Sequence, residues 1–170
     1  MLAILTLGIG YAALSDDLSV TATANTPAFD PSVYIDTDYD ITSATRNGES
    51  IANPTSNDDY TITVGGTGTD AVTLTVDGFL ATNGDSIVFV FNVVNASAFE
   101  VTLGTPTITY TTNDGTFTAT AVLGSSTLAA ATTSNPEVST TLTVTINLAK
   151  EVTNDSGASE TITITMNAEA

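Results

Sequence analysis

Apolar and polar residues alternate along most of the chain, and threonine often fills the polar positions. A period of two places one side of a segment in a core and the other in solvent, as in a half-buried β-strand. Turn residues such as Gly65-Gly66 and Asp77-Gly78 separate these segments. We expect strands at residues 18–24, 60–64, 72–76, 86–95, 99–103, 108–110, 117–119, 142–148 and 162–166.

The segments 108–110 and 117–119 flank Asn113-Asp114-Gly115, whose residues accept a positive φ, so we expect a hairpin there. Two stretches are less regular. Residues 27–58 contain three of the five prolines and are predicted to be a long, partly extended surface excursion. Residues 124–137 are predicted to be a second loop with one helical turn.

This spacing, with roughly nine to eleven strands, is typical of a β-sandwich or jelly roll. We therefore expect an all-β fold, a jelly-roll-like β-sandwich, formed as a single domain by residues 15–170. An extended apolar strand precedes it.

Residues 1–14 read MLAILTLGIGYAAL and allow three interpretations. A transmembrane helix needs about 20 apolar residues, more than this run offers. A signal-peptide core would precede the small-x-small sequence Gly10-Tyr11-Ala12, but no basic region comes before it. The third interpretation, which we favour, is a strand.

In an extended strand Leu5, Leu7, Ile9 and Tyr11 share one face, and Gly8 and Gly10 lie on the other. Large side chains on one face can fill pockets, while glycines allow another backbone to approach closely. An apolar terminal strand of this kind is suited to donor-strand complementation, in which it completes the sheet of a neighbouring subunit. We expect these six residues to form a subunit interface.

The chain has 170 residues, 35 of them Thr, and a net charge of −17 from 19 acidic and 2 basic residues. This balance excludes nucleic-acid binding, which needs cations against phosphates. The chain has no His and no Cys, which excludes Ser–His and Cys–His catalysis and zinc sites built from those residues. The sequence shows no catalytic constellation, so we expect the protein not to be an enzyme and to have no small-molecule substrate. We expect no cofactor other than the Ca²⁺ considered next.

Asp36, Asp38 and Asp40 form a D-x-D-x-D sequence. In an uninterrupted strand these carboxylates would point the same way, and a cation would relieve their repulsion. The sequence fails the EF-hand pattern, since Ile41 replaces the required Gly. Two interpretations stay open: a solvated acidic loop, or a Ca²⁺ site of another geometry, with Asp58 and Asp59 as further ligands.

Asn95-Ala96-Ser97 and Asn154-Asp155-Ser156 are N-glycosylation sequons. Short sequons arise easily by chance in a chain rich in Asn and Ser. Asn95 and Asn154 are therefore candidate acceptors, and Asn154 is the better one because it lies in a polar turn.

Four segments resemble the TasA/camelysin family of biofilm-matrix fibre proteins and the related archaeal bundling pilins: 8–16 (GIGYAALSD), 18–24 (LSVTATA), 83–95 (NGDSIVFVFNVVN) and 160–166 (ETITITM). The resemblance implies a secreted jelly-roll subunit that is polymerised by an N-terminal donor strand and sometimes bundled. Camelysin has been described as a metalloprotease. This chain has no His for an HExxH zinc site, so protease activity is not implied.

We thus expect a structural subunit of an extracellular, cell-surface filament or biofilm-matrix fibre, in which residues 1–14 complete the next identical subunit. Secretion would use a signal peptide that is absent from or trimmed in this sequence. The alternative is a monomeric β-sandwich domain of an adhesin or surface-layer protein. In that case loops at 27–58 or 124–137 would bind a partner.

Overall fold

The computed structural model describes residues 32–57, 60–150 and 158–170, and its regular elements in these ranges are all strands. No helix long and apolar enough to span a membrane occurs among them. The strands are β1 (Val33–Arg46), β2 (Glu49–Ser50), β3 (Thr61–Gly65), β4 (Ala71–Asp77), β5 (Ser86–Asn95), β6 (Val101–Leu103), β7 (Thr107–Tyr110), β8 (Phe117–Leu123), β9 (Thr127–Leu128), β10 (Val138–Leu148), β11 (Ser159–Thr165) and β12 (Ala168–Glu169).

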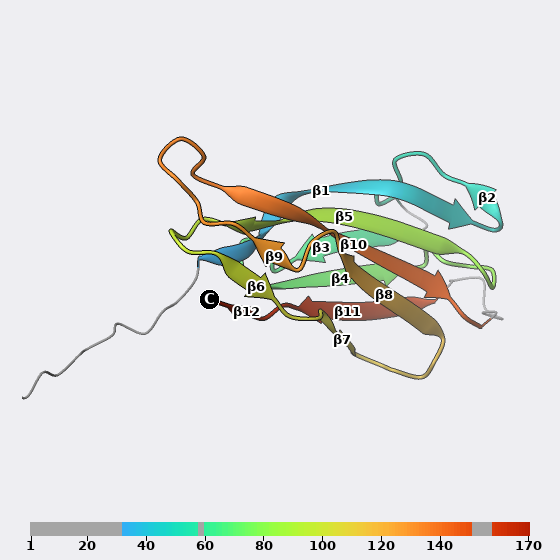
Figure 1. The fold of residues 1–170 in the computed structure, drawn as a ribbon. Helices are drawn as coiled ribbons and strands as arrows, with labels where there is room; N and C mark the ends of the chain where they lie inside the picture. The colour runs from blue at the N-terminus through green and yellow to red at the C-terminus, as the bar shows by residue number, and fades with distance from the viewer. Residues whose placement is uncertain (1–31, 58–59, 151–157) are drawn as a thin grey trace, which may run out of the picture.

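Two larger sheets form the layers of a β-sandwich (Figure 1). The first has the order β2-β1-β5-β10-β8 and the second β3-β4-β11-β7, while β12-β6-β9 form a small third sheet. Every strand pair within the described ranges is antiparallel. The expected all-β sandwich is confirmed. The strand expected at residues 18–24 lies outside the described residues.

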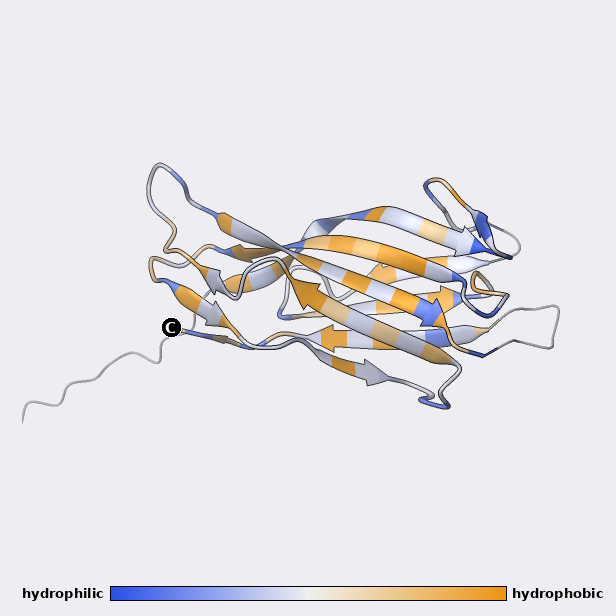
Figure 2. Ribbon diagram, turned by 45° about the vertical axis from the view of Figure 1, so that its right-hand side comes forward, coloured by the Kyte–Doolittle hydropathy of each residue, from blue (hydrophilic) through white to orange (hydrophobic). Residues whose placement is uncertain are grey.

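The alternation of side chains explains why these segments are strands. In β4, Val72, Leu74 and Val76 are buried, while Thr73 and Thr75 lie on the opposite face. The hydroxyls of Thr73 and Thr75 contact those of two β11 threonines across the strand pair, at 3.4 and 3.0 Å. Figure 2 shows the same change between hydrophobic and hydrophilic positions along most strands. Threonine suits this outer face because its branched side chain fits a pleated surface.

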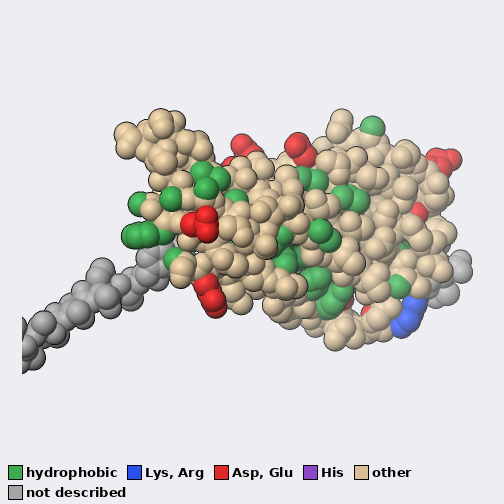
Figure 3. All heavy atoms as spheres, in the orientation of Figure 1, with side chains coloured by type: hydrophobic (Ala, Val, Ile, Leu, Met, Phe, Trp, Pro, Cys, Tyr) green, Lys and Arg blue, Asp and Glu red, His purple; other side chains and the backbone are tan. Residues whose placement is uncertain are grey.

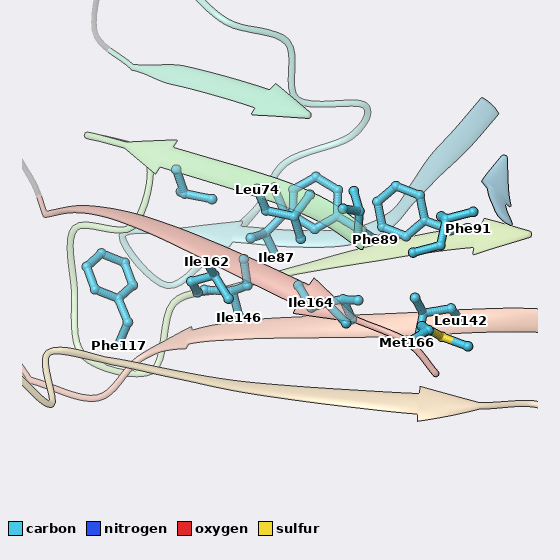
Figure 4. Close-up of a cluster of buried hydrophobic side chains, with 14 of the residues drawn as sticks. Leu74, Ile87, Phe89, Phe91, Phe117, Leu142, Ile146, Ile162, Ile164 and Met166 are labelled. Atoms are coloured by element: carbon cyan, nitrogen blue, oxygen red, sulfur yellow. The ribbon is translucent and has the colours of Figure 1, made fainter. Parts of the chain in front are cut away.

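The core lies between the two larger sheets (Figure 4). Phe89 and Phe91 of β5 are buried, with ring centroids 6.3 Å apart and nearly parallel planes. Tyr39 of β1 lies beside both rings, at 6.2 and 5.7 Å. β5 lies between β1 and β10, and its almost continuous apolar sequence goes with side chains that are buried or half-buried on both faces at every position but Asn92.

The expectation for residues 27–58 is wrong over most of the described part of that stretch. Residues 33–46 form β1, which pairs with β5 from Val33↔Asn95 to Ala44↔Ile87. The register shifts between Ile35 and Tyr39 and again between Ile41 and Ser43. The first shift adds two residues to β1 and keeps the parity of its inward-facing side chains, whereas the second adds one residue and changes that parity. The strand therefore does not show a simple period of two.

A two-residue turn joins β1 to β2. Asn47 and Gly48 both have positive φ values, 55° and 74°. Asn-Gly is the preferred sequence for such a hairpin, because these residues tolerate positive φ better than others. This Asn-Gly pair was the sequence signal for a strand at residues 33–46.

The expected hairpin at residues 113–115 is a turn, but its flanking strands do not pair with each other. β7 pairs with β11 in one sheet, and β8 pairs with β10 in the other. The backbone N–H of Ala119 donates instead to the Tyr110 hydroxyl, at 2.7 Å. The turn therefore connects the two layers at one side of the sandwich.

The loop expected at residues 124–137 contains β9 and an isolated bridge between Thr132 and Asn135. It has no helical turn. The backbone groups of Thr132 and Asn135 bond to each other in both directions, which closes a tight turn in place of a helix.

Candidate functional site

Asp85 is the most strongly anchored carboxylate in the described ranges. Its side chain is buried, and its oxygens accept hydrogen bonds from the backbone N–H groups of Asn47, Gly48, Ala81 and Thr82, at 2.8–3.0 Å. Two of the donors belong to the β1–β2 turn and two to the segment before β5. One side chain thus holds two loops together at this end of the sandwich.

These contacts also set the protonation of Asp85. Burial by itself raises the pKa of its carboxyl, but the four backbone N–H groups outweigh burial and hold the pKa below its ordinary value. Donors aimed at the carboxylate favour its charged form. Asp85 is therefore a structural anion at neutral pH.

A lowered pKa makes this anchor sensitive to acid. The carboxylate contributes its full stability above the unfolded-state pKa of about 3.9, and loses it as pH falls through the lower folded-state pKa. We expect the native chain to lose stability relative to an Asp85→Asn variant only below about pH 4. Urea unfolding of both chains between neutral and acid pH measures the difference. A difference that stays constant into strong acid would contradict the prediction.

Asn95 is the corresponding anchor at the other end of β5. It is fully buried, and its amide Nδ2 donates to the carbonyls of Phe99 and Ala129, at 2.8 and 2.9 Å. Its Oδ1 accepts from the backbone N–H and the hydroxyl of Ser97. This placement argues against Asn95 as a glycosylation site in the folded domain, since a glycan would displace both carbonyls. Asn154 lies outside the described residues.

Asp85 and Asn95 flank the largely apolar run within the segment 83–95 that resembles the fibre family. Both have structural roles here, because each ties loops to an end of β5. Polar residues on both sides of an apolar run are therefore compatible with the central strand of any sandwich of this size. It carries information about the fold more than about chemistry.

The three expected calcium ligands lie on β1. Asp36, Thr37 and Asp38 occupy the first bulge, and the Asp36 carboxylate accepts the backbone N–H of Thr37 at 2.6 Å. The bulge interrupts the extended geometry that would point Asp36, Asp38 and Asp40 the same way. No group of three or more acidic side chains in the described ranges is placed to hold a metal ion. Asp58 and Asp59 lie outside those ranges, so the calcium site stays a prediction.

A pocket of about 540 Å³ opens where β1 begins. Its lining is Val33, Tyr34, Ile35, Thr69, Asp70, Val93, Met166, Asn167, Ala168 and Glu169. Apolar side chains and two carboxylates contribute to this lining, without a basic group. Such a pocket can receive an uncharged or cationic group, but it lacks a nucleophile paired with a base.

The outer edges of the two sheets differ in how well they are protected. At β3, the Ser56 hydroxyl accepts from the N–H of Ile62 and donates to its carbonyl. At β1, Ile35 bonds to Gly68 and Thr69, and the acidic bulge follows. Caps, bulges and charges are common means of preventing further strand pairing.

Along the edge at β8, the described residues show a single cap, the Tyr110 hydroxyl that accepts the N–H of Ala119, and no bulge or charge. Its sequence, FTATAVL, has no charge and no proline, and it pairs with β10 without a register shift. Val122 is 61% exposed, while Ala121 and Leu123 are half-buried. An uncharged, regular edge strand invites pairing with another strand. It is the candidate interaction site, and it is identified by the strand order, which gives β8 a neighbour on one side only.

Residues Leu5, Leu7, Gly8, Ile9, Gly10 and Tyr11, expected to form the donor strand, lie outside the described residues. No known protein family, curated protein or solved structure matches the chain.

Proposed function

We propose that the protein is a non-enzymatic structural subunit of an extracellular filament or biofilm-matrix fibre, polymerised by donation of its N-terminal strand. The observation that carries the proposal is the uncharged, regular edge at β8, which is longer than the uncharged edge at β7 and which, unlike β1, has no bulge. The apolar residues 1–14 supply a strand of the same chain that could add to a neighbour.

The energetics favour such an exchange. Burying Leu5, Leu7, Ile9 and Tyr11 would contribute roughly 1.5–3 kcal/mol each, and main-chain hydrogen bonds would add to this. The contact is heterologous, because donor and acceptor are different surfaces. Repetition of such a contact builds an open filament unless its rotation closes a ring.

Charge would govern how filaments associate. With a net charge of −17 per chain, neighbouring filaments repel until salt screens them or divalent cations bridge them. The exposed carboxylates of Asp38 and Asp40 lie on β1 and are available for such bridging. Bundling would therefore increase with ionic strength and with added Ca²⁺.

The alternative is a monomeric domain of an adhesin or surface-layer protein. The pocket at the start of β1 favours it, because a concave site with mixed lining can hold a ligand. In this case residues 1–14 would be dispensable for association.

Negative-stain electron microscopy of three chains tests the proposal: the full chain, a chain beginning at Asp16, and a chain beginning at Thr26. We expect filaments from the full chain and none from the chain beginning at Thr26, which lacks both residues 1–14 and residues 18–24. Monomeric particles from the full chain would overturn the filament and favour the binding module. Filaments from the chain beginning at Thr26 would show that the N-terminal strand is not the polymerising element. If the chain beginning at Asp16 forms filaments and the chain beginning at Thr26 does not, the donor strand lies within residues 16–25.

A further inference from the structure

We propose that residues 18–24 of one subunit pair antiparallel with the free edge of β8 in a second subunit. The inference rests on the proposed function, and it specifies both the acceptor edge and the part of the N-terminal segment that pairs with it. It assigns residues 1–14 no partner on β8.

The backbone geometry of β8 shows which groups are free. Gly124 donates to Thr141, and Thr116 accepts from Ala149, so the even-numbered residues of this strand bond to β10. In an antiparallel ladder the alternate residues then point outward. Ala119 is one of these, and its N–H is taken by Tyr110. The outward groups of Ala121 and Leu123 have no backbone partner among the described residues.

The side chains beside this edge leave room for a further strand. Ala119 and Ala121 are small, and together with Leu123 of β8 and Ile108 of β7 they are only partly buried against the core. In the space-filling view, hydrophobic side chains appear at the surface where β7 and β8 lie (Figure 3). A strand added here would cover them, and its opposite face would continue the polar outer face of Thr118 and Thr120.

Residues 18–24 have the pattern that such a position requires. Leu18, Val20, Ala22 and Ala24 would face the core, and Ser19, Thr21 and Thr23 would face solvent. Strands β4, β10 and β11 of the sandwich alternate apolar residues with threonine in the same way. Residues 1–14 fit this position less well, because their second face contains Ile4, Gly8 and Gly10 in place of polar residues.

Chain geometry indicates that the donor comes from a second copy. Every described strand pair is antiparallel, and sheets of a single type are favoured. An antiparallel partner of β8 would place residue 24 opposite Phe117. Val33 lies in the same row as Val138, and Phe117 pairs with Leu148, ten residues further along β10.

Ten residues correspond to about 33 Å along the sheet, and four strand spacings add about 19 Å across it, which gives roughly 38 Å in total. The nine residue steps from residue 24 to residue 33 span at most about 32 Å. On these lengths the segment falls short of this position in its own subunit by roughly 6 Å, which favours a donor from a second copy.

Cysteine cross-linking tests the proposal cleanly, because the chain has no Cys. Full-length Thr120→Cys is mixed in urea with full-length Ser19→Cys, Thr21→Cys or Thr23→Cys, refolded and oxidised. Three donor positions are used because a disulfide forms only between Cβ atoms about 3.5–4.5 Å apart. We expect one of the three mixtures to give roughly tenfold more disulfide-linked heterodimer than the others, since strand register selects one pair.

Two controls isolate the acceptor and the donor. Thr63→Cys, an exposed threonine on the edge strand β3, replaces the acceptor. Thr6→Cys replaces the donor with a position in residues 1–14. Heterodimer between Thr63→Cys and a donor variant would overturn the assignment of the β8 edge as the acceptor. Heterodimer between Thr6→Cys and Thr120→Cys, in place of the three donor positions, would overturn the assignment of residues 18–24 as the donor. If the double variant Thr21→Cys/Thr120→Cys forms its disulfide only within one chain, the claim that the donor comes from a second subunit would be wrong.

Microscopy of the same samples separates the two levels of failure. Filaments without any cross-link to Thr120→Cys would reject this inference and leave the filament subunit intact. Monomers without cross-links would reject both. Filaments whose register-specific heterodimer involves residue 19, 21 or 23 support both.

Discussion

Replacing Asp85 by alanine is expected to lower the free energy of unfolding by about 3–5 kcal/mol, the range for breaking a buried charged network. Asp85 accepts four backbone hydrogen bonds while almost fully buried. Without it, four N–H groups lose their acceptor, and each unsatisfied buried donor costs about 1–3 kcal/mol. The loss is less than their sum, because the β1–β2 turn can open to water.

Urea unfolding followed by circular dichroism measures the effect of Asp85→Ala. Asp77→Ala is the matched control, because Asp77 is exposed at the end of β4, and a change within about 0.5 kcal/mol is expected there. Equal midpoints for Asp85→Ala and the native chain would show that the turn at Asn47 and Gly48 is held by other contacts.

Replacing Phe89 by alanine is expected to lower the free energy of unfolding by about 3–5 kcal/mol. Phe89 is fully buried on the central strand β5, stacks on Phe91 and contacts Tyr39 of the neighbouring strand. Truncation removes this packing and leaves a cavity between the sheets. Because β5 is paired on both sides, the backbone cannot easily move to close that cavity.

Phe99→Ala is the control for Phe89→Ala, since the Phe99 side chain is 56% exposed and a change below about 1 kcal/mol is expected. Thermal unfolding of the three chains gives the comparison. Similar losses for Phe89→Ala and Phe99→Ala would place the packing core elsewhere than between Phe89 and its neighbours.

The all-β sandwich follows from local pattern, and the sequence predicts much of it. Strands such as β4 and β11 alternate apolar residues with threonine, and each has one face in the core. The pattern fails for β1, because the register shift between Ile41 and Ser43 changes which alternate residues point inward. It also fails at residues 113–115, where the turn residues predict a bend but not that the flanking strands enter different sheets. Partner choice depends on contacts distant in sequence, and periodicity does not record them.

The candidate site was less accessible to sequence reasoning. The spacing of Asp36, Asp38 and Asp40 would place their carboxylates on one face of a regular strand. The bulge between Ile35 and Tyr39 interrupts that regular geometry. Asn95 matched a sequon, but burial gives its amide a structural use. By contrast, the edge at residues 117–123 becomes visible only when the strand order shows that β8 has a neighbour on one side. Uncharged sequence alone does not distinguish an edge strand from a central one.

The first bulge of β1 has a mechanical consequence. A pull along β1 from its N-terminal end loads the β1–β5 ladder in shear, and many hydrogen bonds must break together. Between Ile35 and Tyr39, β1 has three residues where β5 has one. Straightening these two extra residues would lengthen the chain by about 7 Å before the ladder from Tyr39 onward carries tension. The run from Val33 to Ile35 would yield first, so β1 combines an extensible beginning with a stiff, shear-loaded remainder.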